Sequence, residues 1–207
     1  MNPQALASHT VDLDLLPESP TVLDVGCRWF DFSQAILKER PQAKIIALDP
    51  ANDVHMLKSR PFMRACTFVR AALVGTGHAR QQFAHFSTGE GDFLTTQTYF
   101  PGWDKQPEFY EVECMSIGEL MLQHSIKHWD LVKLDCEGSE FDILERWPGP
   151  IATQVSCEFH DWDKPVYRSE TYYDGLWKKL PWYRIVQHEF TRQGNGIGHW
   201  DTLIVLR

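Results

Sequence analysis

The sequence predicts an α/β protein with an open, mostly parallel sheet that is doubly wound, with helices on both faces. Two apolar strands, at residues 21–25 and 131–134, each deliver a carboxylate to their C-terminal end, Asp24 and Asp135. Strand and helix patterns alternate along the chain, which is typical of βαβ units. Because ligands of such sheets bind in the crevice at the carboxyl ends of the strands, we expect the functional site at this edge.

We expect an N-terminal arm or helix over residues 1–19 and a single domain over residues 20–207. The predicted strands are 21–25, 44–48, 66–70, 80–86, 112–115, 131–134 and 153–159, and the predicted helices are 32–39, 53–58, 117–124, 141–146 and 172–180. Residues 183–189 and 202–206 should close the sheet as an antiparallel pair around a turn at Gly194. Residues 87–110 lack a helical period, so we expect a long excursion that carries a substrate loop.

Composition limits the function classes. The chain has 207 residues and a net charge of −8, and its only adjacent basic pair is Lys178-Lys179. A nucleic-acid surface requires clustered basic residues, so nucleic acid is not an expected partner. No apolar run approaches the roughly 20 residues of a membrane span, and we expect neither a membrane nor a signal segment. Five scattered cysteines without a CxxC spacing indicate reduced thiols in a cytoplasmic protein.

The first strand and the helix after it resemble a nucleotide site. Gly26 allows close approach of the backbone to a ligand, and a helix N-terminus favours a negative group. Asp49, at the end of the second strand, can accept hydrogen bonds from both hydroxyls of a ribose. Each acid has a structural alternative: Asp24 could cap a loop, and Asp49 could form a turn before Pro50. Together, at this spacing, they predict an adenosine-containing ligand.

The loop after Gly26 argues against a dinucleotide. A pyrophosphate site requires GxGxxG, whereas Gly26 is followed by bulky Trp29 and Phe30 and acidic Asp31. These side chains could suit a ligand with an amino acid end. The sequence therefore predicts S-adenosylmethionine as the cofactor.

Several runs resemble one known family. "VLDVG", "ALDP", "RAAL", "WDLVKLDCEGSEFDILE" and "SCEFH" are similar to the FkbM-type methyltransferases, a class I family dependent on S-adenosylmethionine. "DLVKLDCEGSEFDIL" is the most specific of these runs. The resemblance covers residues 21–206. It implies a Rossmann-like, seven-stranded sheet with a reversed hairpin at its end, and O-methylation of a hydroxyl on a small molecule such as a sugar or polyketide-like metabolite.

The resemblance also implies positions for the cofactor. The expected cofactor-binding residues are Asp24, Gly26, Cys27, Arg28, Asp49, Pro50, Arg70, Ala71, Leu134 and Asp135. The first loop would lie beside the methionyl part, Asp49 would hold the ribose, and Arg70 with Ala71 would border the adenine. Leu134 and Asp135 would lie beside the sulfonium and the acceptor.

The first loop departs from the family pattern "DVGANxG", because Arg28 replaces the asparagine and Phe30 replaces the last glycine. A guanidinium suits a forked contact with a carboxylate, so Arg28 could bind the carboxylate of the ligand. Alternatively, Arg28 could pair with Asp31 on the surface. Phe30 could crowd the pocket and weaken binding.

Methyl transfer to an unactivated hydroxyl requires alignment of the acceptor and removal of its proton. Asp135, Glu158 and His160 follow two neighbouring strands, and we expect them to be the catalytic base and its orienting partners. Asp135 could instead bind only backbone amides, His160 could be a rim residue, and Glu137 and Glu140 could be partners of a helix N-terminus. Asp135, Glu158 and His160 could also bind one divalent metal. No spacing enforces that, so we assign no metal.

Aromatic residues crowd two connections at the expected acceptor edge. They are Tyr99, Phe100, Trp103, Phe109 and Tyr110 in the excursion, and Trp162, Tyr167, Tyr172 and Tyr173 after His160. They could form a stacking wall for the acceptor or simply pack under a loop. Three rival functions stay open: a non-catalytic module that binds an adenosyl ligand, a nucleotide-dependent oxidoreductase, and a methyltransferase with a nucleic-acid or protein acceptor.

Overall fold

The computed structural model describes residues 2–51, 65–76, 80–86, 92–95, 105–160, 170–192 and 198–207. The predicted helix at 53–58, the turn at Gly194 and most of the excursion at 87–110 lie outside these residues. In the described part of the chain, no helix has the length and apolar character needed to cross a membrane.

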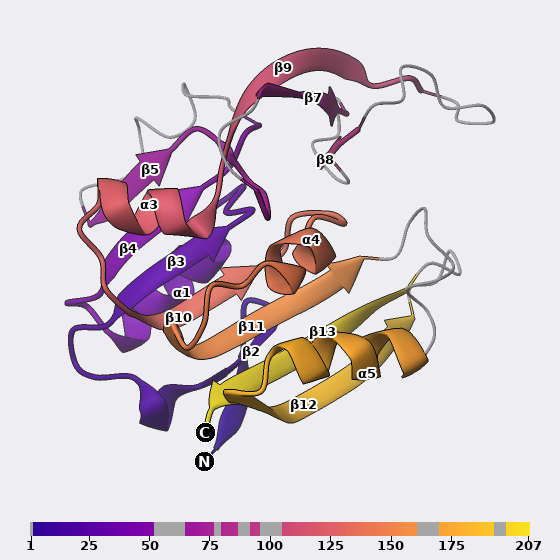
Figure 1. Ribbon diagram of the computed structural model, residues 1–207. Helices are drawn as coiled ribbons and strands as arrows, with labels where there is room; N and C mark the ends of the chain where they lie inside the picture. Colours follow the sequence, from indigo (N-terminus) through magenta and orange to yellow (C-terminus); the bar gives the residue numbers. More distant parts are fainter. Residues whose placement is uncertain are drawn as a thin grey trace.

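A central sheet of seven strands organises the molecule (Figure 1), in the order β12-β13-β11-β10-β3-β4-β5. Its strands are β3 (Thr21–Val25), β4 (Lys44–Leu48), β5 (Cys66–Val69), β10 (Trp129–Leu134), β11 (Ala152–His160), β12 (Tyr183–Arg192) and β13 (Gly198–Leu206). The five strands from β5 to β11 are parallel, whereas β13 runs antiparallel to both of its neighbours. The predicted mostly parallel sheet with an antiparallel C-terminal hairpin is confirmed.

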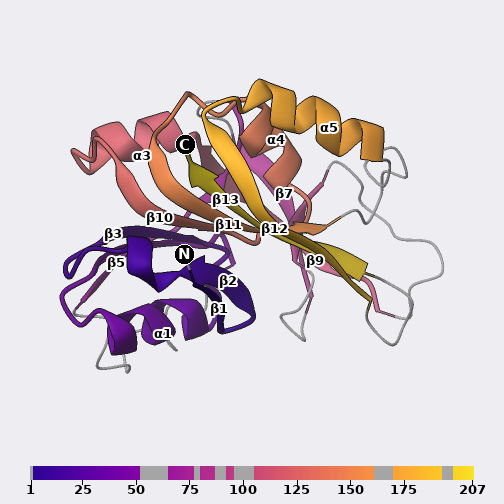
Figure 2. The same cartoon turned by 90° about the horizontal axis from the view of Figure 1, so that it is seen from below.

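Helices cover both faces of this sheet, as predicted for a doubly wound fold. Figure 2 shows α1 (Asp31–Glu39) on one face, and α3 (Ile117–Gln123), α4 (Glu140–Glu145) and α5 (Glu170–Lys179) on the other. The two central strands, β3 and β10, are therefore covered on both sides, and most of their side chains are apolar. In β10, Leu131, Val132 and Leu134 are fully buried. A charged side chain inside such a strand needs a specific partner, which makes Lys133 the exception to explain.

The N-terminal arm is a β-hairpin, and the alternative of a short helix is wrong. Strands β1 (Pro3–Leu6) and β2 (His9–Asp12) pair antiparallel, and a short 3-10 turn follows at Leu13–Leu15. Ala7 and Ser8 have positive φ angles of 45° and 69°, which reverse the chain. The hairpin lies on the α1 face of the sheet (Figure 2).

Two buried hydrogen bonds attach the hairpin to the central sheet. The backbone N–H of Asp12 donates to Gln154 Oε1 at 2.9 Å, and Gln154 Nε2 donates to the carbonyl oxygen of Asp12 at 3.0 Å. Gln154 belongs to β11 and has no exposed surface. The arm is therefore part of the packed domain, and its last strand lies beside the edge where the functional site was expected.

A second, four-stranded sheet lies above the central one in Figure 1, in the order β6-β9-β7-β8. Its strands are β6 (Ala72–Leu73), β7 (Arg80–His85), β8 (Phe93–Leu94) and β9 (Glu108–Met115). The sequence predicted strands near 80–86 and 112–115, but not that they pair. Strand β9 begins at Glu108, inside the range assigned to the excursion. The local sequence there indicates only a loop, but the backbone hydrogen-bonding groups of β9 pair with those of the distant β7.

Candidate active site

The loops after β3 and β10 touch directly at Gly26. Its φ angle is +71°, and a Cβ atom built there would lie 1.7 Å from the carbonyl oxygen of Asp135. No side chain fits in that space, so only glycine allows the two loops to meet. The sequence had indicated close approach of a ligand as the reason for this glycine. The structure gives a reason within the chain, and it brings the two predicted loops to one edge.

Lys133 links the same two loops and was missed as a site residue. Its side chain is 3% exposed, and its Nζ atom donates to the carbonyl oxygens of Val25 at 3.1 Å and Gly26 at 2.7 Å. The same atom lies 3.5 Å from Asp24 Oδ1 and 3.2 Å from Asp135 Oδ2. Burial opposes the charge, but the two carboxylates together hold the pKa of Lys133 above its usual range. A lysine inside an apolar strand was the signal for this role.

Asp24 is a structural partner of that lysine. Its side chain has no exposed surface, and Oδ2 accepts a 2.6 Å hydrogen bond from the hydroxyl of Ser33 in α1. The carboxylate therefore faces the interior and compensates the buried charge of Lys133. The side chain of Asp24 is enclosed, so it cannot touch the methionyl part of a cofactor. It could act there only by supporting the loop that follows β3.

Asp49 follows β4 at the same edge, next to Pro50. Its Oδ2 atom accepts from the backbone N–H of Arg28, and Oδ1 accepts from the backbone N–H of Ala51, both at 2.8 Å. Burial raises the pKa of this carboxyl from 3.8 to about 6, against the effect of the two amides. Asp49 thus forms the turn that was its structural alternative. Each of its oxygens retains a second lone pair, with which it could hold a ribose hydroxyl.

Arg28 lies in the first loop with a positive φ of 38°. Its Nε and Nη2 atoms are buried, and neither has a hydrogen-bond partner among the described residues. The guanidinium carbon lies 5.8 Å from the centre of the Trp29 ring. In the described part of the chain no ion pair joins Arg28 to Asp31, so the surface pair considered from the sequence is not formed. Buried donors without an acceptor are costly, so these two nitrogens are available to an acceptor from outside the described residues.

The neighbouring Phe30 and Cys27 point into the core. Phe30 is fully buried with a φ of 62°, and it packs with Cys27, Ala47 and Phe68. Its backbone lies in the left-handed region that favours glycine, while its ring contributes to the core, so it does not line an open pocket. Burial raises the pKa of the Cys27 thiol well above its usual range. Any contact of Cys27 with a cofactor would involve its backbone.

The remaining predicted cofactor residues lie on the same edge. Arg70 directly follows β5 and is exposed. Ala71 is 3% exposed, and Leu134, the last residue of β10, is fully buried. Arg70 is the one of the three whose side chain can reach a ligand freely.

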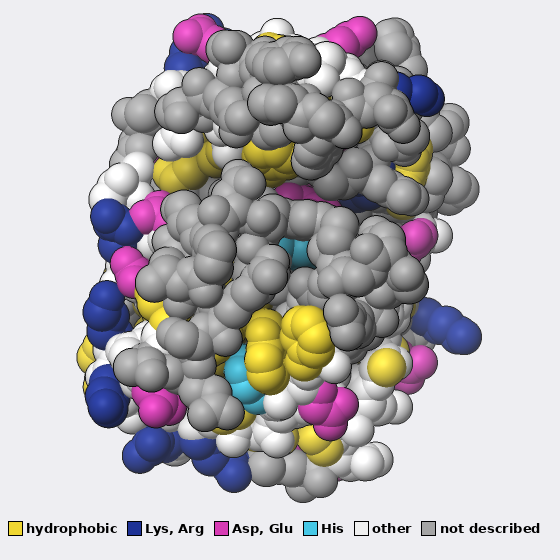
Figure 3. All heavy atoms as spheres, turned by 90° about the vertical axis from the view of Figure 1, so that its right-hand side faces the viewer, with side chains coloured by type: hydrophobic (Ala, Val, Ile, Leu, Met, Phe, Trp, Pro, Cys, Tyr) yellow, Lys and Arg dark blue, Asp and Glu magenta, His cyan; other side chains and the backbone are white. Residues whose placement is uncertain are grey.

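The structure brings the three predicted catalytic residues together at the end of β10 and β11. His160 Nε2 lies 3.3 Å from Glu158 Oε1, 3.6 Å from Glu137 Oε2 and 3.9 Å from Asp135 Oδ1. On its other side, His160 Nδ1 lies 3.2 Å from Glu140 Oε1. Histidine side chains are visible on the side of the molecule toward which β11 points (Figure 3). His160 is therefore the centre of a carboxylate cluster rather than a surface rim residue.

Glu140 orients this histidine. It has no exposed surface, and its carboxylate also accepts from the backbone N–H groups of Cys136 at 2.8 Å and Gly138 at 2.9 Å. Burial opposes protonation of His160, but Glu140 and the other carboxylates raise its pKa well above the usual range. Burial likewise opposes ionisation of Asp135, but Lys133, His9 and His160 lower the pKa of that carboxyl.

Three further residues of the cluster were missed. His9 Nε2, from the N-terminal hairpin, lies 3.4 Å from Asp135 Oδ2. In β13, His199 Nδ1 lies 3.2 Å from Glu158 Oε1, and His199 Nε2 lies 3.4 Å from Asp201 Oδ2. His199 and Asp201 share one face of a strand that pairs with β11, and that spacing was the available signal. No sequence signal connected His9 to the site, because it is 126 residues from Asp135.

The aromatic wall is described only in part. Tyr99, Phe100, Trp103, Trp162 and Tyr167 lie outside the described residues. The ring centre of Tyr110 lies 5.5 Å from that of Phe83. The ring centres of Tyr172 and Tyr173 lie 5.4 Å and 5.9 Å from that of Phe141. Phe109 packs against Ala84 and Phe86. These four aromatic residues take part in ordinary packing, and a stacking wall for the acceptor stays a prediction.

Comparison with protein families identifies the chain. The model of the methyltransferase FkbM domain matches residues 28–183. The chain belongs to the FkbM methyltransferase family. A comparison with curated proteins found no match. The resemblance seen in the sequence motifs is therefore confirmed.

Solved structures show the same fold as this FkbM chain. A methyltransferase FkbM from Methylobacillus flagellatus has a TM-score of 0.51 at 13% identity, covering 94% of this chain and 46% of that one. TrmK from M. capricolum, in complex with S-adenosylhomocysteine, has a TM-score of 0.52 at 11% identity over 95% and 69% of the two chains. Methanococcus jannaschii fibrillarin, a pre-rRNA processing protein, has a TM-score of 0.55 at 7% identity over 95% and 70%. The class I methyltransferase fold is thus confirmed, although the chain spans less than half of the M. flagellatus protein.

Proposed function

We propose that this chain transfers a methyl group from S-adenosylmethionine to a hydroxyl oxygen of a small molecule, such as a sugar or polyketide-like metabolite. The observation that carries the proposal is the half-buried side chain of Arg28, whose buried Nε and Nη2 atoms lack partners among the described residues. The backbone of the same residue is bound by Asp49 at 2.8 Å. A hydrogen-bond donor for a carboxylate end and a carboxylate for a ribose therefore lie next to each other.

This pair of groups fits the cofactor better than it fits a nucleotide phosphate. Arg28 would bind the carboxylate of the methionyl part with two parallel hydrogen bonds, and Asp49 would hold the ribose diol. Arg70 would border the adenine. TrmK, which shares the fold, is solved with S-adenosylhomocysteine. When bound, S-adenosylmethionine supplies a methyl group made electrophilic by its sulfonium centre.

The acceptor would bind at the cluster around His160. In-line displacement requires the acceptor oxygen to be held close to the methyl carbon, and Asp135 lies between the first loop and the cluster. Its Oδ2 faces Lys133, while Oδ1 faces His160. As the new bond to carbon forms, the attacking oxygen becomes positively charged and its proton becomes acidic. A carboxylate of low basicity can then accept this proton, so Asp135 is the proposed base, with His160 and Glu158 orienting the hydroxyl.

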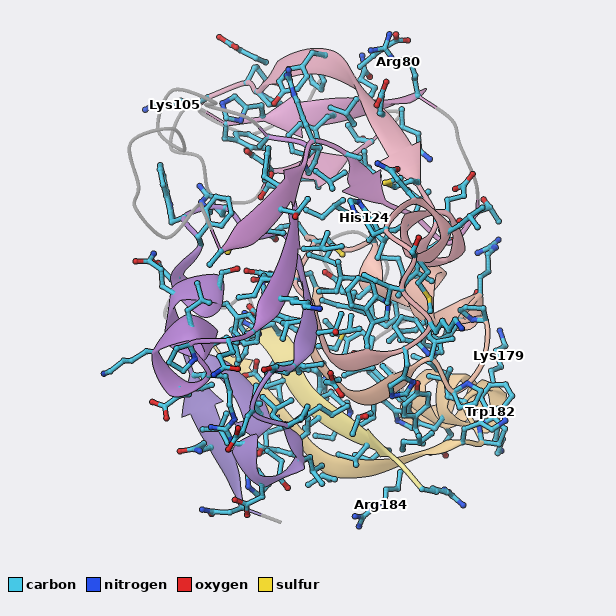
Figure 4. All side chains as sticks on the ribbon, turned by 90° about the vertical axis from the view of Figure 1, so that its left-hand side faces the viewer. Arg80, Lys105, His124, Lys179, Trp182 and Arg184 are labelled. Carbon is cyan, nitrogen blue, oxygen red and sulfur yellow. The ribbon has the colours of Figure 1, made fainter. Side chains whose placement is uncertain are left out.

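A small molecule is the acceptor class favoured by charge. The chain carries a net charge of −8. In Figure 4, Arg80 and Lys105 lie near the top of the molecule, Lys179 lies on its right side, and Arg184 lies at its bottom. Counterion release on a phosphate backbone requires a clustered basic surface, and these side chains are dispersed. RNA is the competing acceptor, since a fibrillarin described as a pre-rRNA processing protein shares the fold.

Transfer of radiolabelled methyl groups tests this function. The protein is incubated with methyl-labelled S-adenosylmethionine and, separately, with hydroxylated glycosides, polyketide alcohols, total tRNA and ribosomal RNA. Label in the small molecules that is lost with Asp135→Asn supports the proposal. Label in RNA alone would overturn the acceptor class. Cofactor binding without transfer to any acceptor would favour a non-catalytic module, and preferential binding of NAD would favour an oxidoreductase.

A further inference from the structure

We propose that His9, Asp135, Glu158 and His160 form a binding site for one divalent transition-metal cation of the Mn²⁺ or Zn²⁺ type. This reverses the assignment of no metal made from the sequence. It also goes beyond the proposed function, because binding of a cation can be measured without methyl transfer.

The donor atoms already lie near coordination geometry. One donor atom each of His9, Asp135 and Glu158 can be chosen so that all three lie within 4.8 Å of one another. His160 Nε2 borders two of these residues, 3.3 Å from Glu158 Oε1 and 3.9 Å from Asp135 Oδ1, and forms a second group with Asp135 and Glu137. Donors bound to a common cation at roughly 2.1 Å lie about 3–4 Å apart, so small side-chain rotations would complete the site.

The second nitrogen of His160 is held as in a metal-binding histidine. Its Nδ1 lies 3.2 Å from Glu140 Oε1. Glu140 is itself fixed by two backbone N–H groups and is fully buried. A carboxylate on one ring nitrogen that leaves the other directed at the ligand is the arrangement that orients metal-binding histidines. Within the described chain, this places Nε2 toward three carboxylates rather than one.

One N–H group of His160 is shared among three acids, although Asp135 also lies beside Lys133 and Glu158 also lies beside His199. His160 Nε2 has Glu158, Glu137 and Asp135 within 3.9 Å. A divalent cation in the same place would interact with all of them at once, and carboxylates this close otherwise repel one another. His199 contributes from the other side, with Nδ1 3.2 Å from the same Glu158 oxygen. Carboxylate oxygens that could bind a cation are therefore concentrated around His160 Nε2.

The kind of donor selects the kind of metal. Two imidazole nitrogens and two carboxylates suit Mn²⁺, Fe²⁺, Co²⁺ or Zn²⁺, whereas Ca²⁺ and Mg²⁺ prefer sites built from oxygen alone. His9 and His160 are 4% and 7% exposed, whereas the side chains of Asp135 and Glu158 are 26% and 14% exposed, so two buried histidines meet two partly exposed acids. At this position a cation would orient the acceptor hydroxyl and make it more acidic.

The inference also explains the place of the N-terminal hairpin. His9 is delivered by β2, which the bonds between Asp12 and Gln154 hold against β11. His9 stacks edge-on against Phe32 of α1, with ring centres 5.5 Å apart. A bound cation would therefore connect the hairpin to the ends of β10 and β11 and stabilise the whole edge.

Calorimetric titration tests the site on the full chain, without an affinity tag and after treatment with a chelator. Mn²⁺ and Zn²⁺ are titrated separately into wild type, Glu158→Gln and His9→Gln. Exposed His128 and Glu39 provide matched controls, His128→Gln and Glu39→Gln. We expect saturable binding of one cation per chain, weakened about tenfold or more in the two site variants and unchanged in the controls.

Absence of saturable binding in the wild type would overturn the metal site, as would wild-type affinity in both Glu158→Gln and His9→Gln. Titration of S-adenosylhomocysteine into the same preparations shows whether each variant is folded. Binding of S-adenosylhomocysteine without binding of a cation would refute the metal site and leave the proposed function intact. Binding of a cation without binding of S-adenosylhomocysteine would support the metal site and count against the proposed function.

Discussion

The Nζ atom of Lys133 donates a 2.7 Å hydrogen bond to the carbonyl oxygen of Gly26. These residues are 107 positions apart in the sequence: Gly26 lies in the loop after β3, and Lys133 lies in β10, two residues before Asp135. Asp24 and Asp135 flank the same nitrogen at 3.5 Å and 3.2 Å. The lysine therefore fixes the position of the first loop relative to Asp135, and both the cofactor and the acceptor sides depend on that placement.

Substitution of Lys133 should strongly destabilise the fold. Lys133→Met leaves the buried Asp24 without its cation, and loss of one partner of a buried pair costs about 3–5 kcal/mol. Urea denaturation measures this change in the free energy of unfolding. Lys179, which forms an exposed pair with Glu145 at 3.3 Å, is the control. Lys179→Met should change stability by about 0.5 kcal/mol or less. A similar small effect for Lys133→Met would show that the buried pair does not hold the loops.

Binding of the cofactor product should depend on pH through Asp49. Its pKa of about 6 in the folded protein lies above the ordinary 3.8, so the carboxyl becomes protonated as the pH falls through 6. A protonated carboxyl accepts fewer hydrogen bonds from a ribose. The affinity for S-adenosylhomocysteine should therefore be constant above pH 7 and fall about tenfold for each pH unit below 6. In Asp49→Asn binding should be weak and this dependence absent. The same slope in the variant would assign the titration to another group.

Arg28 should recognise the carboxylate of the ligand. Arg28→Ala should weaken binding of S-adenosylhomocysteine about ten- to hundredfold, the usual loss for a hydrogen bond to a charged group. It should leave unchanged the affinity for 5′-methylthioadenosine, which lacks the amino acid end. Arg184→Ala, at an exposed position of β12, is the control. Equal losses for both ligands would mean that Arg28 supports the loop and does not contact the carboxylate.

Gln154 should hold the N-terminal hairpin in place. Gln154→Ala removes both hydrogen bonds to Asp12 and leaves its buried backbone groups unsatisfied, at a cost of about 1–3 kcal/mol. Amide hydrogen exchange should become faster in β1 and β2, while the affinity for S-adenosylhomocysteine stays unchanged, because the hairpin lies on the acceptor side. Exposed Gln123 provides the control Gln123→Ala. Unchanged exchange in the hairpin would show that other contacts hold His9 in the site.

The sequence predicted the central sheet well, because its strands are local apolar runs that end in acids. It also placed Asp135, Glu158 and His160 at one edge, since parallel strands end on the same side of a sheet. Lys133 was overlooked, although a cation inside an apolar strand always needs a partner. His9 could not be foreseen, because its contact with Asp135 depends on how the hairpin folds against β11. The second sheet was missed for the same reason, as its pairing of β7 with β9 is not local.

Departures from the family pattern were interpreted only in part. Arg28 was expected to bind a carboxylate or to pair with Asp31, and its buried Nε and Nη2 atoms, which have no partner among the described residues, favour the first alternative. The sequence left open that Phe30 crowds the pocket, but its ring is buried in the core. The sequence shows that phenylalanine replaces glycine at position 30. The direction of the Phe30 side chain depends on its φ angle of 62°, which the sequence does not show.

The central claim is that this edge of the sheet binds an adenosyl ligand through Asp49. The most direct measurement is calorimetric titration of S-adenosylhomocysteine into the wild type and Asp49→Ala at pH 7.5. We predict saturable binding at one site per chain in the wild type, weakened about tenfold or more in the variant. No binding to the wild type, or equal affinity in Asp49→Ala, would contradict the account and leave only a shared fold.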